Sequence, residues 1–513
     1  MFRRRFWILI LVVLAIAAET RFLGITDRSL WFDEAFSVSV ARFDLPHIVQ
    51  FVQIGDTHPP FYYALLSGWV RLFGTSELGV RSLSALLGVL TVLLLYAFAS
   101  RLVDREVAVA AAALAASSAF AAHAGQEARM YPLLGFLALA SWFAMLMAIE
   151  DKKRWGWALY VVSTVLMLYT HYFGFLVLGA QALYLAPRLW GDRRTALAAG
   201  LALGCVLVLF IPWVPAFIRE AMSGRGWPTF RPPADFRQVL DLLGMFGFGG
   251  ELLGMGGYFH SGGLPLWEGT LITLPFVALV GAGLCALRGG RAWLLICYWA
   301  VPIATAITVS QRFNIFYARY FSFLVPAFAL LVAAGVDLVA RRVSQPTGGR
   351  WLGRSGAMAV LVVLLLGINI PVVSGYTYQG MGDYDWRGAA EVVTAKAQPN
   401  DYILFVPGFA EVAFEYYYKG ALPRTQLTPL EVYRMVGIRQ VSIPRVDKAW
   451  GCRLAAGHPH LWIVATFPFP ESAYSRLQSL LKDGFEPDRG WDFHSVFLYQ
   501  LRSRLYHSTA AQR

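Results

Sequence analysis

Charged residues are scarce in this chain: only 15% of its 513 residues are Asp, Glu, Lys or Arg, whereas 57% are hydrophobic. A soluble protein of ordinary composition carries about 25% charged residues, so the composition excludes an ordinary soluble enzyme. Repeated apolar stretches of about 20 residues instead predict a protein that crosses a membrane many times. The net charge of +12 falls in short clusters between these stretches, so it does not predict a nucleic-acid partner.

Cysteine is also rare, with four in the chain. Cys205, Cys285 and Cys297 lie inside apolar stretches and Cys452 stands alone in the polar C-terminal part, so we expect no disulfide framework and no zinc site. The sequence also lacks a Walker-type phosphate loop, an HExxH motif and paired CxxC motifs. The missing ATP motif argues against a primary pump.

The apolar stretches predict a mainly α fold with about eleven transmembrane helices. The predicted spans are 6–23, 80–100, 107–122, 131–149, 156–170, 172–187, 196–217, 268–287, 292–309, 319–340 and 356–374. The first of them, with its leading arginines, resembles a signal peptide. Because its apolar run continues, we expect it to remain as a membrane anchor.

Basic clusters fall in alternate loops between these spans. The clusters are Arg3–Arg5, Arg101 with Arg105, Lys152–Arg154, Arg188 with Arg193 and Arg194, Arg288 with Arg291, and Arg341, Arg342, Arg350 and Arg354. The positive-inside rule then predicts a cytoplasmic N-terminus. The periplasmic side receives the first loop (24–77), a short loop around Gln126–Arg129, the loop Arg219–Trp267 and the tail.

Two domains follow from this topology: a membrane domain over 1–374 and a periplasmic α/β domain over 375–513. In the second domain we expect helices at Trp386–Gln398 and Ser472–Lys482 and strands at Tyr402–Val406, Leu461–Thr466 and Ser495–Leu501. A domain of about 135 residues has a normal size.

The first outer loop contains two adjacent carboxylates, Asp33 and Glu34, directly after Trp31 and Phe32. The aromatic residues suit the membrane interface and would hold Asp33 near lipid headgroups. The alternative is that both acids only cap and solvate an interfacial helix. Further along the loop, His58 precedes two prolines; it either marks the entry of a helix or donates a hydrogen bond to a phosphate.

Two more outer segments carry ionisable residues. Glu127 and Arg129 lie at the mouth of two apolar spans, where such residues are often functional; a mutual ion pair is the alternative. Arg312 and Arg319 lie among aromatic residues before a late span. They either clamp a phosphate or anchor the protein to lipid headgroups.

These motifs occur in an order that resembles a known family. They are the Asp-Glu pair, His58-Pro59-Pro60-Phe61-Tyr62-Tyr63, Arg81, Gln126-Glu127-Ala128-Arg129-Met130-Tyr131, Ala318-Arg319-Tyr320-Phe321 and Asp383-Tyr384-Asp385-Trp386-Arg387-Gly388-Ala389. The chain resembles the GT-C glycosyltransferases over nearly its whole length. It looks most like the bacterial glycosyltransferase family 39, which includes protein O-mannosyltransferases and the lipid A aminoarabinose transferase.

The resemblance implies inverting transfer of a sugar from a polyprenyl-phosphate carrier to an acceptor outside the cytoplasm. It maps the catalytic carboxylates onto Asp33, Glu34 and Glu127, and it leaves open whether Asp33 or Glu127 is the base. The residues expected to bind substrate are His58, Arg81, Arg129, Tyr131, Arg319 and Tyr320. The aminoarabinose transferase has Lys-Pro-Pro where this chain has His58-Pro59-Pro60, which argues against aminoarabinose as the sugar.

The required chemistry fits these residue types. A hydroxyl acceptor needs a carboxylate to take its proton, and a leaving phosphate needs fixed positive charge. No cofactor is needed, although carboxylates can bind a divalent ion. The expected partners are the lipid donor, membrane lipids, and a glycan, lipid or protein acceptor in the cell envelope.

Three other functions compete with this interpretation. A glycan polymerase, ligase or oligosaccharyltransferase would use a polyprenyl-diphosphate donor. A transporter or flippase would show internal repeats and broken spans around a midplane site, and no such repeat is evident. An inactive scaffold would use its tail to bind a partner.

Overall fold

The computed structural model of the chain describes most of its residues. They are residues 2–189, 191–223, 234–248, 266–344, 353–375, 384–426, 448–466, 477–479 and 481–506. Two compact units emerge. The helical unit comprises Met1–Ile25 and Thr57–Thr377, and the tail unit comprises Thr26–Asp56 and Tyr378–Arg513. Part of the first predicted outer loop therefore packs with the C-terminal part of the chain.

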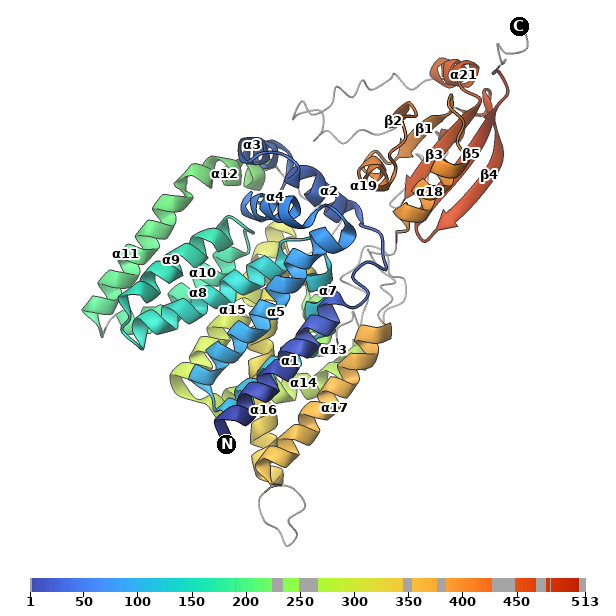
Figure 1. Ribbon diagram of the computed structural model, residues 1–513. Helices are drawn as coiled ribbons and strands as arrows, with labels where there is room; N and C mark the ends of the chain where they lie inside the picture. Colours follow the sequence, from blue (N-terminus) through green and yellow to red (C-terminus); the bar gives the residue numbers. More distant parts are fainter. Residues whose placement is uncertain are drawn as a thin grey trace. The chain divides into compact units, whose positions relative to one another are not determined.

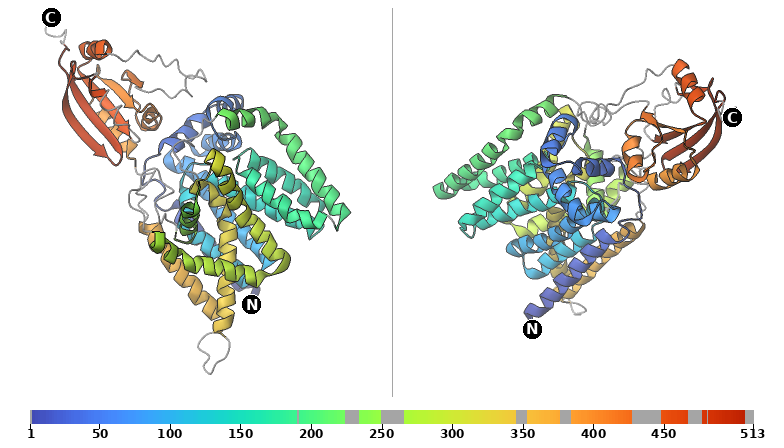
Figure 2. Two further views of the ribbon diagram at one scale, coloured as in Figure 1. Left: turned by 180° about the vertical axis from the view of Figure 1, so that it is seen from behind. Right: turned by 45° about the horizontal axis from the view of Figure 1, so that its top comes forward.

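The helical unit consists of long apolar helices (Figures 1 and 2). They are α1 (Phe2–Phe22), α4 (Phe61–Phe73), α5 (Glu77–Leu102), α6 (Arg105–Ser117), α7 (Ala119–Gln126), α8 (Tyr131–Ile149), α9 (Arg154–Leu168), α10 (Gly174–Leu189), α11 (Arg193–Phe210), η1 (Ile211–Trp213), α12 (Val214–Ser223), α13 (Phe236–Phe248), α14 (Leu266–Leu287), α15 (Gly289–Phe313), η3 (Ala318–Leu324), α16 (Val325–Val343) and α17 (Arg354–Gly375).

By length and composition, five helices among the described residues can cross a membrane. They are Glu77–Leu102, Tyr131–Ile149, Arg193–Met222, Gly289–Phe313 and Ala318–Val343. A sixth span results if the bent pair α6 and α7, with its 55° break, counts as one. Four shorter apolar helices accompany them. The chain is thus a helical multi-pass membrane protein, and the count of eleven spans stays a prediction.

The basic clusters meet at one end of the helical unit, which we call the basic end. There Arg101, at the end of α5, donates to Asp151 after α8. Arg354, at the start of α17, bonds both Asp104 and Asp337. Figure 1 shows the N-terminus, the end of α16 and the start of α17 at this end. The opposite end holds the starts of α5 and α8, and we call it the aromatic end.

Small residues let two helices of this unit touch backbone to backbone. A Cβ added to Gly335 of α16 would lie 2.0 Å from the carbonyl oxygen of Leu279, and one on Gly283 of α14 would lie 2.1 Å from that of Leu331. Small residues at such contacts are typical of helix packing in membranes. The crossing of α14 and α16 therefore depends on glycine at both positions.

The tail unit is an α/β domain built on a sheet of order β2-β1-β3-β5-β4. Its strands are β1 (Tyr402–Val406), β2 (Arg424–Gln426), β3 (His460–Thr466), β4 (Phe485–Phe493) and β5 (Val496–Ser503). Strand β1 is parallel to β2 and β3, whereas β5 is antiparallel to β3 and β4. Its helices are α2 (Phe32–Ala41), α3 (Leu45–Gly55), α18 (Trp386–Lys396), α19 (Ala410–Tyr417) and α21 (Lys448–Gly457).

Most elements expected in this domain are present. The helix expected from Trp386 is α18, the strand at Tyr402–Val406 is β1, and those at Leu461 and Ser495 are β3 and β5. Much of the helix expected at 472–482 lies outside the described residues. Leu477 and Leu481 of that segment belong to the buried cluster around α21. Helices α19 and α21 and strands β2 and β4 were not predicted from the sequence.

Candidate active site

A break between α6 and α7 positions the first residues of the site. Arg21 of α1 is buried and donates to the carbonyl oxygens of Ala115 and Ala116, where α6 ends. These carbonyls have no partner within the helix because the helix stops there. Ser118 then caps α7, its hydroxyl accepting from the Ala121 amide over 3.4 Å. The buried guanidinium thus stabilises the 55° bend that turns α7 toward the aromatic end.

Glu127 follows α7 directly and is only 9% exposed. Its Oε1 lies 3.2 Å from Nε2 of His123, one helical turn earlier. Burial raises the pKa of Glu127, but attraction to His123 and to two arginines outweighs this effect and lowers the pKa from 4.5 to about 2. Glu127 is therefore a carboxylate at neutral pH. Because a general base works best with a pKa near the working pH, Glu127 is a weak candidate for that role.

The two arginines, Arg129 and Arg319, come from distant parts of the chain and meet at the Tyr131 ring. Their guanidinium carbons lie 5.9 Å and 5.8 Å from its centroid. Arg129 is 4% exposed, and Ser84 of α5 donates to its backbone carbonyl over 3.1 Å. Arg319 is half-buried and donates to the Tyr317 hydroxyl over 3.0 Å. Aromatic rings thus hold two cations in place beside Glu127.

His171, in the turn between α9 and α10, completes this set. Its ring centroid lies 5.0 Å from that of Tyr320 and 5.2 Å from that of His58. The Phe173 amide donates to Nδ1 over 3.1 Å, so the ring proton of neutral His171 lies on Nε2. This Nε2 is buried and has no hydrogen-bond partner among the described residues. Burial, with repulsion from His58 and from Arg129, holds the pKa of His171 well below its usual 6.5.

A buried donor without an acceptor calls for an explanation, because most buried polar groups are paired. His171 presents a neutral N–H in surroundings that also contain two guanidinium groups. Donors and cations together suit an anion. We call the set His58, Glu127, Arg129, Tyr131, His171, Arg319 and Tyr320 the Glu127 cluster.

His58 and Arg81 have local partners at the aromatic end. His58 is 9% exposed, and its Nδ1 lies 3.2 Å from the hydroxyl oxygen of Thr57. Just after it, the Phe61 amide donates to the carbonyl of Tyr169, which ties the start of α4 to the turn that carries His171. Arg81 donates over 2.7 Å to the carbonyl of Ile25 and so ties α5 to the chain after α1.

Asp33 and Glu34 belong to the tail unit, on the first turn of α2. Glu34 is fully buried, and its Oε2 accepts a hydrogen bond from the Trp31 amide over 3.3 Å. This is the reach-back contact of a capping box, so Glu34 has the capping role that the sequence left open. Asp33 is half-buried. Burial, and then repulsion from Asp33, raise the pKa of Tyr384, which places that ring near the carboxylate.

The C-terminal part of the tail unit holds the segment before α2. Ser29 donates to Asp385 over 3.3 Å and accepts from the Arg387 amide over 3.1 Å. The Leu30 amide donates to the Tyr417 hydroxyl over 2.6 Å. The Asp-Trp-Arg-Gly motif at 385–388 therefore has a structural role: it fixes the backbone that leads into the Asp33 helix.

The structure gathers six of the nine predicted site residues in the Glu127 cluster and places Asp33 and Glu34 in the other unit. His171 and His123 were not among the site residues predicted from the sequence. The four-residue spacing of His123 and Glu127, one helical turn, was a usable signal for the second. For His171 the signal was a Thr-His-Tyr-Phe stretch between two apolar spans. Among the described residues, no three His, Cys, Asp or Glu side chains gather as metal ligands.

One part of the chain matches a known protein family in sequence. Residues 57–216 match the family described as dolichyl-phosphate-mannose-protein mannosyltransferase. The matched segment contains His58, Arg81, Glu127, Arg129 and His171, but not Asp33 or Arg319. No curated protein sequence matches the chain.

Solved structures match nearly the whole chain. Apo ArnT from Cupriavidus metallidurans has a TM-score of 0.65 at 15% identity, covering 96% of this chain and 97% of that one. The same protein bound to undecaprenyl phosphate has a TM-score of 0.62 at 14% identity, covering 98% and 99%. The oligosaccharyltransferase AglB from Archaeoglobus fulgidus has a TM-score of 0.55 at 13% identity, covering 97% and 74%. The chain therefore has the fold of the GT-C glycosyltransferases, and its residues 57–216 match the dolichyl-phosphate-mannose-protein mannosyltransferase family.

Proposed function

We propose that the protein is an inverting glycosyltransferase of a bacterial inner membrane, with a cytoplasmic N-terminus and a periplasmic tail unit. It transfers a sugar from a polyprenyl-phosphate carrier to a hydroxyl on a glycan, lipid or protein of the cell envelope. The observation that carries this proposal is the Glu127 cluster, in which two arginines and a buried histidine N–H surround aromatic rings at one end of the membrane helices.

The charges of the cluster match the change in charge during transfer. Arg129 and Arg319 together outweigh Glu127 by one positive charge. A polyprenyl-phosphate sugar is a phosphodiester with one negative charge, and the lipid phosphate that leaves carries a second. Fixed cations and donors that meet this new charge lower the barrier. A fixed histidine N–H adds a donor without adding repulsion between cations.

The acceptor proton needs a separate base, and we assign that role to Asp33. The acceptor oxygen forms a bond to the anomeric carbon while the bond from that carbon to the phosphate oxygen breaks. The electron pair of the broken bond goes to the phosphate, and the acceptor proton goes to the carboxylate. Glu127 is less suited because its neighbours lower its pKa to about 2. Glu127 instead limits the excess positive charge around Arg129 and Arg319.

Similarity to solved structures supports a lipid-phosphate ligand. ArnT was solved with undecaprenyl phosphate, and AglB with a dolichol phosphate and an inhibitory peptide. Both lipids are polyprenyl monophosphates. The alternative that an experiment must separate is an oligosaccharyltransferase, polymerase or ligase with a polyprenyl-diphosphate donor.

Binding of the leaving product tests the phosphate site. Undecaprenyl phosphate should raise the melting temperature of the purified protein more than the uncharged polyprenol does. Because a hydrogen bond to a charged group contributes about 1.5–3 kcal/mol, Arg319→Ala should weaken binding roughly ten- to hundredfold. Arg319→Lys should lose less, since it keeps the charge but not the two-pronged guanidinium. Arg312→Ala is the matched control, because Arg312 is exposed and has no described partner.

Two results would contradict this site. Equal stabilisation by the polyprenol would show that no phosphate is recognised. Much tighter binding of undecaprenyl diphosphate would favour the diphosphate-linked donor instead.

Turnover tests the base. Asp33→Asn keeps the shape of the side chain but removes its basicity. Because a positioned base contributes about 100- to 10,000-fold, sugar transfer in reconstituted vesicles should slow at least a hundredfold while undecaprenyl phosphate still binds. Near-normal transfer by Asp33→Asn would remove the assignment, and a loss confined to Glu127→Gln would move the role to Glu127.

A further inference from the structure

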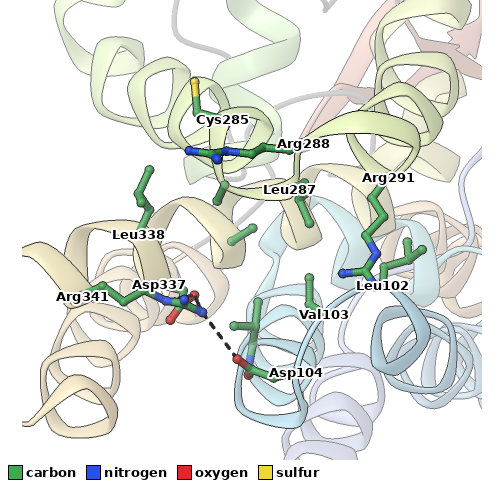
Figure 3. A pocket seen from close by; sticks show the side chains of 13 residues that line it. Leu102, Val103, Asp104, Cys285, Leu287, Arg288, Arg291, Asp337, Leu338 and Arg341 are labelled. Carbon is green, nitrogen blue, oxygen red and sulfur yellow. Dashed lines mark hydrogen bonds and ion pairs between the residues drawn. The ribbon is translucent and has the colours of Figure 1, made fainter.

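A cavity lies at the basic end of the helical unit, the end opposite the Glu127 cluster. It has a volume of about 530 Å³. Its walls come from the turn between α5 and α6, the turn between α14 and α15, and the last two turns of α16 (Figure 3). A cavity of this size holds a small ligand or a headgroup.

Two aspartates on one wall are already neutralised. Asp337 accepts from Arg341 over 2.9 Å and from Arg354 over 2.6 Å. Arg354 also bonds Asp104. Burial raises the pKa of Asp104, but its bonds to Arg354 and to the Val107 amide outweigh this and lower the pKa. Asp104 therefore stays charged, and Arg341 and Arg354 supply one positive charge for each aspartate.

Two further arginines line the cavity without such compensation. Arg288 and Arg291 are exposed, and neither has a hydrogen-bond or ion-pair partner among the described residues. Figure 3 shows both on the α14–α15 side of the cavity, across from Asp104 and the Asp337–Arg341 pair. The three arginines and two aspartates that line the cavity leave one positive charge in excess. Arg354, which bonds both aspartates from outside the lining, adds a second.

The backbone at Arg288 points to a use for its side chain. Arg288 has a φ of +47° and the next residue, Gly289, has a φ of +58°. Glycine adopts this left-handed conformation readily, whereas a long side chain rarely does. An arginine in this strained position suggests that its charge is needed at the mouth of the cavity.

The remaining lining is aliphatic. It comprises Leu102, Val103, Val107, Ala286, Leu287, Ala334 and Leu338. A free phosphate has no apolar atoms to pack against these walls, whereas the glycerol and acyl carbons of a phospholipid do. Guanidinium groups bind phosphate oxygens in pairs. Basic pockets between membrane helices on the cytoplasmic side bind anionic lipid headgroups in other proteins.

We propose that this cavity binds the headgroup of an anionic glycerophospholipid, with Arg288 and Arg291 on its phosphate. The site is independent of the proposed transfer reaction, because no residue of the Glu127 cluster lines it. Failure of one proposal therefore leaves the other unaffected.

A natural reporter sits in the cavity. Cys285 lines it and is exposed, whereas Cys205 is exposed on α11 and is not among the lining residues. The rate of maleimide labelling at each cysteine can be followed by mass spectrometry on the full-length protein. Phosphatidylglycerol should slow labelling of Cys285, compared with phosphatidylcholine, and leave Cys205 unchanged. At a lipid concentration ten times the Kd, the site is free about one tenth of the time, so labelling should be about tenfold slower.

Two variants tie the protection to the arginines. Arg288→Ala with Arg291→Ala should abolish the protection by phosphatidylglycerol. Arg288→Gly should weaken it while suiting the left-handed turn, so this variant guards against a loss caused by misfolding. Arg193→Ala with Arg194→Ala is the matched control, since this exposed pair starts α11 and does not line the cavity.

Each outcome is decisive. Protection that survives in the Arg288→Ala and Arg291→Ala protein, or that is lost equally in the control pair, overturns the site. Equal protection by phosphatidylcholine shows that the site does not distinguish an anionic headgroup from a zwitterionic one. Equal protection by inorganic phosphate identifies a soluble anion as the ligand and removes the lipid.

Discussion

Carboxylates lie near arginines at both ends of the helical unit, but in different surroundings. At the aromatic end, Glu127 is buried and its cations lie against tyrosine rings. At the basic end, Asp104 and its arginine partners are partly exposed. Charges interact more strongly where water is excluded. We therefore expect the charges around Glu127 to matter for binding, whereas the partly exposed ion pairs of Asp104 should contribute little to stability.

The largest effect is expected at the buried carboxylate. Glu127→Gln removes the carboxylate whose Oε1 lies 3.2 Å from Nε2 of His123. It also removes the negative charge that attracts Arg129 and Arg319. Because breaking a buried ion pair costs about 3–5 kcal/mol, the variant should melt at a much lower temperature. The extra positive charge should also hold undecaprenyl phosphate more tightly. A melting curve like that of the wild type would show that the buried carboxylate does not contribute more to stability than the exposed one.

Much of this difference between the two ends could be predicted from the sequence. The alternation of basic clusters predicted which loops share a face, and Arg101, Arg341 and Arg354 do meet at one end. The order of motifs predicted that Glu127 and Arg319 belong together.

Other features could not be predicted because they depend on distant contacts. The bonds of Ser29 to residues near 385 decide that α2 packs in the tail unit, and local pattern does not reveal them. Strand β4 was missed since it contains Pro487 and Gly490, both poor in strands. It tolerates them because it is an edge strand with an irregular register near Pro487. The tautomer of His171 depends on one backbone amide.

A smaller effect is expected where Arg21 fixes the bend before the aromatic end. A Cβ on Gly88 of α5 would lie 2.6 Å from Nε of Arg21, whose guanidinium is held by carbonyls and cannot move freely. Overpacking of this kind costs about 1–3 kcal/mol, so Gly88→Ala should lower the melting temperature and weaken lipid-phosphate binding by displacing α7. Gly200→Ala is the control, because no atom lies within 4 Å of that added Cβ. Equal behaviour of the two variants would contradict the role of Arg21.

The pH dependence of stability sharpens the comparison further. The folded protein keeps His171 neutral, whereas the unfolded chain binds a proton below about pH 6.5. The unfolded state therefore gains protons as the pH falls, and stability should drop by up to about 1.4 kcal/mol per pH unit below that point. Melting temperatures between pH 7 and 5 should fall less steeply for His171→Gln. A slope unchanged in His171→Gln would contradict the buried neutral ring.

The smallest effect is expected at the basic end, where Asp104→Asn is the counterpart of Glu127→Gln. Asp104 also caps α6 by accepting from the Val107 amide over 3.1 Å, and asparagine caps helices as well as aspartate does. The substitution thus removes only the charge. Exposed pairs contribute about 0.2–1 kcal/mol, and Arg354 keeps its bond to Asp337, so the melting temperature should barely change.

The cavity, however, gains one more uncompensated positive charge, so phosphatidylglycerol should protect Cys285 at lower concentration. If Asp104→Asn destabilises the protein as much as Glu127→Gln does, the two ends do not differ in the way that their burial predicts.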